Sequence, residues 1–165
     1  MRTKKLCALG LLTAIALTIF MIEAQLPPLT SVPGIKLGLA NLVTLFALYY
    51  LGSWEALAIL ACRIFLGAVF SGQMSAILYS AAGGLLSFGV MVLLRRAVTE
   101  KQIWVLGCIG AIFHNIGQLG VAVLITKTSQ LWGYLPVLLV SGILAGLFTG
   151  VGAQSLLKHM RKLEK

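Results

Sequence analysis

Six long apolar segments, separated by short stretches rich in glycine, proline or charge, most constrain what this chain can fold into. Most of them approach the ~20 residues that an α-helix needs to cross a bilayer. Only 10% of the 165 residues are charged, whereas a soluble domain carries roughly 25%. The sequence therefore predicts an all-α integral membrane protein, with one domain over residues 1–165. The predicted spans are residues 6–22, 35–51, 56–70, 74–94, 103–125 and 135–157.

The basic residues predict the orientation of these spans, because lysine and arginine gather in cytoplasmic loops. With six spans and an inner N-terminus, the outer loops hold only Lys36 and Lys127, and Arg63 lies within a span. We therefore expect both termini in the cytoplasm. The ten inner basic residues are Arg2, Lys4, Lys5, Arg95, Arg96, Lys101, Lys158, Arg161, Lys162 and Lys165.

Arg63 is the most informative polar residue, because it lies in the middle of the third predicted span. A charge at a helix centre costs about 2.5–3.5 kcal/mol on insertion scales and usually faces the bundle interior. The four glutamates fall near the membrane faces in this topology, with Glu23 near the outer one, so no carboxylate is expected beside Arg63. Two interpretations stay open. Arg63 binds an anionic group of a ligand, or it serves only the fold, by bonding backbone carbonyls or by extending toward the membrane surface from a shifted short helix.

Two further spans carry polar residues that are candidates for ligand binding. His114 and Gln118 are four residues apart on one helix face, with Asn115 adjacent. They predict an inward-facing polar face, and the alternative is hydrogen bonding between helices. Asn41 lies in the second span, and Lys36 lies at its outer end, where it extends to solvent or captures an anion at the external mouth of a pocket.

Small residues recur every four positions on the first and last spans, as they do where membrane helices pack closely. Packing within the bundle and docking of a partner subunit both explain such a pattern. On the first span the residues are Gly10, Ala14 and Thr18, and on the sixth they are Gly142, Gly146 and Gly150.

The sequence lacks the motifs of several enzyme classes. It contains no aspartate, so it cannot form the aspartate-rich magnesium–diphosphate site of prenyl chain elongation. It also has no GxxxxGK[ST] loop for ATP, no CxxCH haem motif and no Cys/His spacing for a metal. We therefore expect no catalytic residues, no metal ligands, no intrinsic cofactor and no nucleic-acid partner.

Four stretches resemble a known family: PGIKLGLANLVTL at 33–45, AGGLLSFGVMVLLRR at 82–96, HNIGQL at 114–119 and LPVLLVSGILAGLFTG at 135–150. They are similar to the bacterial Gx transporter family, whose members are often labelled heptaprenyl diphosphate synthase component I. That family is similar to the substrate-binding S components of energy-coupling-factor (ECF) transporters. The resemblance implies six helices with both ends cytoplasmic, a place in the plasma membrane of a bacterial cell, and docking on a shared transmembrane subunit with two ATPases. The stripe on the first span resembles the S-component docking motif, although it departs from the usual alanine pair.

Two functional hypotheses follow. In the first, the chain is a solute-binding membrane subunit of transporter type for a small anionic or amphipathic molecule. In the second, it is a membrane component of quinone- or flavin-linked extracellular electron transfer, with redox partners and a quinone or flavin as ligand. An accessory role in isoprenoid or quinone metabolism is a further alternative. Membrane lipid surrounds the chain in each case. The ligand-binding residues expected are Arg63, His114, Asn115, Gln118, Asn41 and Lys36.

Overall fold

The computed structural model describes residues 2–25 and 38–163, and all regular secondary structure in these ranges is helical. Five of the described helices are long and apolar enough to cross a membrane. This confirms the all-α membrane fold predicted from the sequence. The five are α1 (Arg2–Glu23), α3 (Ser53–Ser71), α4 (Ala76–Leu94), α5 (Ile103–Thr126) and α6 (Leu135–Leu163). The shorter elements are α2 (Asn41–Tyr50) and the 3-10 helices η1 (Glu100–Gln102) and η2 (Ser129–Tyr134).

Helix α2 is shorter than the predicted span 35–51, which is a correction to the sequence prediction. It has 10 residues and is about 15 Å long, half of a typical hydrocarbon core. Gly38 has a φ of 79°, in the left-handed region, so the regular helix cannot extend back through it. The amide of Asn41 donates to the carbonyl of Gly38 in the turn that precedes the helix. Residues 35–37, including Lys36, lie outside the described residues.

Helix α2 lies at the centre of the bundle. It contacts each of the five longer helices, and all its residues from Val43 to Tyr49 are buried. Leu45 and Leu48 are among the largest fully buried side chains, and they belong to the main apolar core. A short helix suits this place because the other helices, not lipid, surround it. The start of α2 therefore lies inside the molecule.

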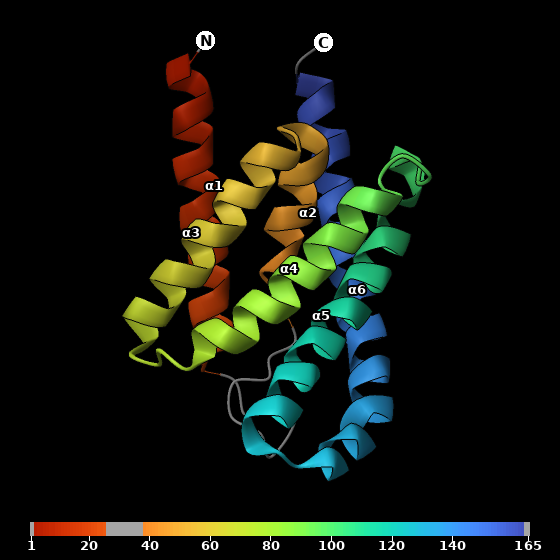
Figure 1. Ribbon diagram of the computed structural model, residues 1–165. Coiled ribbons are helices and arrows are strands. Elements are labelled where there is room, and N and C mark those ends of the chain that lie inside the picture. Colours follow the sequence, from red (N-terminus) through yellow and green to blue (C-terminus); the bar gives the residue numbers. More distant parts are fainter. Residues whose placement is uncertain (1, 26–37, 164–165) are drawn as a thin grey trace.

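The other helices form two groups around α2. Helix α1 packs mainly on α3, whereas α4, α5 and α6 pack side by side in chain order. The start of α1 and the end of α6 lie at the same end of the molecule (Figure 1).

Helices α5 and α6 approach so closely that their backbones touch. A Cβ atom on Gly107 would lie 2.5 Å from the carbonyl oxygen of Gly146, and one on Gly146 would lie 2.5 Å from the Cα of Cys108. A Cβ on Gly150 would lie 2.5 Å from the Cα of Trp104. Real side chains cannot occupy such positions, so the glycines of α6 pack within the bundle. This favours packing over partner docking for Gly142, Gly146 and Gly150, all of which are buried.

Candidate functional site

Arg63 lies in the interior, as expected for a charge in the middle of a span. Arg63 is only 2% exposed, and its guanidinium carbon lies 5.8 Å from the centroid of the Phe20 ring on α1. The charge of Glu23, at the end of α1, acts on it. A carboxylate thus influences Arg63, which the sequence analysis did not expect, although no ion pair between Glu23 and Arg63 is seen in the part of the chain that the structure describes. Glu23 does not face the membrane surface, because the end of α1 turns it into the bundle, where it is 5% exposed.

Glu23 also holds the chain that leads into α2. Its Oε1 accepts a hydrogen bond from the backbone N–H of Gly38 at 2.6 Å, and its Oε2 accepts one from Leu39 at 3.0 Å. Sequence reasoning missed this role. A signal was present, because a carboxylate in the last turn of a helix is unfavourable with the helix dipole and needs other partners. Here those partners include two backbone amides.

His114 and Asn41 meet beside Gly38. A Cβ on Gly38 would lie 2.9 Å from His114 Cδ2 and 3.1 Å from Asn41 Nδ2, so only glycine leaves both side chains in place. On the other side of the imidazole, a Cβ on Gly83 of α4 would lie 3.1 Å from His114 Cε1. The charge of Arg63 acts on His114. We call Glu23, Gly38, Asn41, Arg63 and His114 the interior polar cluster.

Several buried polar atoms of this cluster have no hydrogen-bond partner within the part of the chain that the structure describes. They are Arg63 Nε and Nη2, Asn41 Nδ2 and His114 Nδ1. A buried polar group left unpaired costs about 1–3 kcal/mol, and lipid offers no replacement for water. Unpaired buried atoms in a native structure call for an explanation, and a bound ligand supplies one.

Asn115 and Gln118 are also buried, at 1% exposed each, but they contact other helices. Asn115 Nδ2 donates to the carbonyl of Leu138 on α6 at 2.7 Å. The Gln118 side chain lies against α4, where a Cβ on Gly83 would be 2.8 Å from its Cγ. Asn115 thus bonds between helices, which is the alternative stated for this trio, although its Oδ1 has no partner among the described residues.

The remaining candidates are placed as follows. Lys36 lies outside the described residues. On α1, Gly10, Ala14 and Thr18 are all exposed, and the Thr18 hydroxyl donates to the carbonyl of Ala14 at 2.9 Å. The glycine stripe of α6 faces α5. On the α1 stripe, by contrast, a Cβ atom on Gly10 would meet nothing within 4 Å in the described bundle. Of the two stripes, only that of α1 is available to another molecule.

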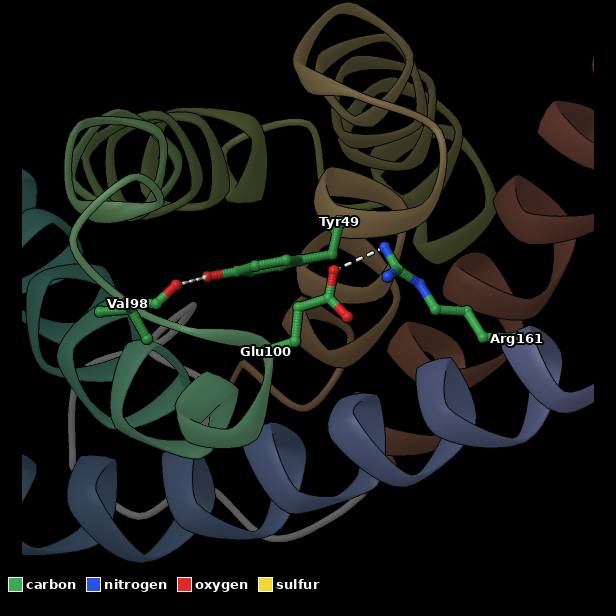
Figure 2. Close-up of polar contacts among 4 residues, drawn as sticks. All are labelled: Tyr49, Val98, Glu100 and Arg161. Carbon is green, nitrogen blue, oxygen red and sulfur yellow. Dashed lines mark hydrogen bonds and ion pairs between the residues drawn. The ribbon is translucent and has the colours of Figure 1, made fainter.

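The end of the bundle that carries the termini is held by a second set of polar contacts. Glu100 of η1 pairs with Arg161 of α6 at 2.5 Å, and the Tyr49 hydroxyl donates to the carbonyl of Val98 at 3.3 Å (Figure 2). Lys5 of α1 pairs with Glu55 of α3. These contacts join segments that are distant in the sequence.

A family model described as heptaprenyl diphosphate synthase component I matches residues 12–156. The chain belongs to this family. The matched range includes all four motifs on which the resemblance was based, so the predicted family is confirmed. Neither a curated protein nor a solved structure matches the chain.

The family description names one component of a synthase. Being a component also implies a partner subunit.

Proposed function

We propose that this chain is a solute-binding membrane subunit of transporter type that holds a small anionic molecule at the interior polar cluster. The observation that carries the proposal is Arg63, a buried cation with two N–H groups unpaired among the described residues. Charged residues inside a membrane bundle typically mark a substrate or ion pathway.

The two unpaired nitrogens of Arg63 define the group that would bind. Nε and Nη2 lie on the same edge of the guanidinium plane, and this edge offers two parallel N–H bonds to two oxygens of one carboxylate or phosphate. A cation–π contact with Phe20 covers the guanidinium from α1. The ligand group favoured by this geometry is an oxyanion with two oxygens available.

The neighbours of Arg63 suit the same ligand. Asn41 Nδ2 is a further unpaired donor, and His114 lies next to it. The carboxylate of Glu23 is already held by the amides of Gly38 and Leu39. No hydrogen-bond partner in the described residues occupies the Nε–Nη2 edge, which is therefore available to a ligand. In this proposal Arg63, Asn41 and His114 contact the ligand, Lys36 attracts it at the mouth, and Asn115 and Gln118 position α5.

The energy for transport would come from partner subunits, because the sequence has no phosphate-binding loop of its own. We place their docking surface on α1, where Gly10, Ala14 and Thr18 are exposed. This surface supports an ECF-like arrangement, with the shared end of the two termini in the cytoplasm of a bacterial cell.

The experiment that tests the proposal is a ligand panel with the purified protein in detergent. Small carboxylates and organic phosphates should raise the melting temperature of the wild-type protein, and uncharged amide or alcohol analogues should not. Arg63→Lys keeps the positive charge but loses the two parallel N–H donors, so it should weaken binding. Arg63→Gln also removes the charge and should weaken binding by about 2 kcal/mol or more, some 30-fold.

The matched control is Ser87→Ala, which removes another buried polar atom without a described partner, outside the cluster. It should leave the response to anions unchanged. Anion-induced stabilisation that persists in Arg63→Gln would refute the proposal.

A further inference from the structure

A pocket lies at the end of α6, next to η1. It has a volume of about 500 Å³, within the range of roughly 300–1,000 Å³ that is common for ligand sites. Helix α6 and the 3-10 helix η1 form it, and Figure 2 shows the Glu100–Arg161 pair that joins these two elements. We call it the basic pocket. Its lining residues are Glu100, Lys101, Gln154, Leu157, Lys158, Arg161 and Lys162.

The basic pocket carries an excess of positive charge. Four of its lining residues are basic and one is acidic, and that one, Glu100, is paired with Arg161. Lys101, Lys158 and Lys162 are exposed, and within residues 2–25 and 38–163 no ion pair engages them. Three lysines around one concavity favour a ligand with an anionic group.

The floor and the surroundings of the pocket are apolar. Leu157 is 2% exposed at its base, while Leu156 and Leu163 on α6 are 49% and 70% exposed. The change from apolar to basic residues along α6 falls between Leu157 and Lys158. Trp104 on α5, three residues after Lys101, is 41% exposed, and tryptophan is enriched at the boundary between hydrocarbon and head groups. The pocket thus lies at head-group depth.

Gln154 adds a polar contact on the membrane side of the lysines. Its Oε1 is buried and has no hydrogen-bond partner in the described part of the chain. An amide oxygen accepts a hydrogen bond from a hydroxyl group. A ligand that combines a phosphate with a hydroxyl would satisfy both the lysines and Gln154.

We propose that the basic pocket binds the head group of an anionic phospholipid of the phosphoglycerol type. The phosphate lies among Lys101, Lys158 and Lys162, a glycerol hydroxyl donates to Gln154 Oε1, and an acyl chain lies along the exposed leucines of α6. Basic pockets between membrane helices bind anionic head groups in this way. The inference rests on charge and depth at this end of the molecule and is independent of the interior polar cluster.

The test measures lipid binding to the full-length protein by native mass spectrometry, with phosphatidylglycerol and phosphatidylcholine of equal chain length as probes. The wild-type protein should retain phosphatidylglycerol in preference to phosphatidylcholine. Lys158→Gln/Lys162→Gln should lower the phosphatidylglycerol affinity about 25-fold, since each basic residue near an anionic lipid contributes on the order of a fivefold change. Lys127→Gln, at the other end of α5, is the matched control and should leave the affinity unchanged.

Three results would overturn the proposal: equal retention of the two lipids, an equal loss in Lys127→Gln, or inorganic phosphate that displaces phosphatidylglycerol at millimolar concentration. The last would assign the pocket to a free phosphate compound. Helix content measured by circular dichroism verifies that each variant is folded. If the double variant does not fold, Lys101→Gln on η1 replaces it and should lower the affinity about fivefold.

Discussion

At Glu23 one carboxylate serves two neighbours. It accepts hydrogen bonds from the amides of Gly38 and Leu39, and its negative charge acts on Arg63. The first interaction holds the entry to α2. The second would lower the attraction of Arg63 for any other anion, so under the proposed function Glu23 has opposite effects on stability and on ligand binding.

Glu23→Gln separates these two effects. The neutral amide makes weaker hydrogen bonds to the two N–H groups, so we expect a loss of about 1–3 kcal/mol in stability. Removal of the negative charge beside Arg63 should raise the affinity for an anionic ligand. Thermal unfolding in detergent measures the first effect, and titration with the ligand measures the second.

Glu100→Gln is the control, because it removes an exposed carboxylate at the other end of the bundle, where a surface ion pair contributes roughly 0–1 kcal/mol. If the two variants unfolded at the same temperature, Glu23 would not hold α2.

The interior polar cluster could be predicted only in part. Arg63, His114 and Asn41 are recognisable from the sequence because a polar side chain in an apolar span needs a reason. Their grouping depends on how each helix is rotated against its neighbours, which residue spacing within one helix does not determine. For the same reason the sequence analysis groups Asn115 with His114, although the Asn115 side chain donates to the carbonyl of Leu138 on α6.

Among the helices, the α5–α6 pair depends most on the absence of side chains. Gly107→Ala would place a Cβ 2.5 Å from the carbonyl oxygen of Gly146. The two backbones must then separate, and overpacking of this kind costs typically about 1–3 kcal/mol.

Gly120→Ala is the matched control on the same helix, because a Cβ there meets nothing within 4 Å. It should be neutral or slightly stabilising, since alanine is the better helix former by about 1 kcal/mol. Thermal unfolding of both variants checks the prediction. Equal melting temperatures would show that the helices tolerate a wider separation.

The helices themselves were largely predictable, because their apolar length is a direct requirement of the bilayer. Helix α2 shows where this reasoning stops. An apolar segment of suitable length predicts a span whether lipid or protein surrounds it. Within that segment, the left-handed backbone of Gly38 keeps α2 from beginning earlier. Burial by the other helices, which the sequence does not display, allows α2 to be only 10 residues long.

For the molecule as a whole, the two termini and η1 should lie on the cytoplasmic side. The positive-inside rule sets this orientation, and the start of α1 and the end of α6 share one end of the bundle (Figure 1). In a variant without the native cysteines, Lys127→Cys should react with a membrane-impermeant maleimide in intact cells, and Lys101→Cys only after permeabilisation. The reverse labelling pattern would contradict the orientation.

The central claim is that Arg63 holds an anion inside the bundle, and native mass spectrometry of the protein released from membranes tests it most directly. The wild-type protein should carry a small molecule with a carboxylate or phosphate group. Arg63→Gln should lose it, and Ser87→Ala should keep it. A wild-type protein that carries only uncharged molecules, or an Arg63→Gln variant that retains the same anion, would contradict the claim.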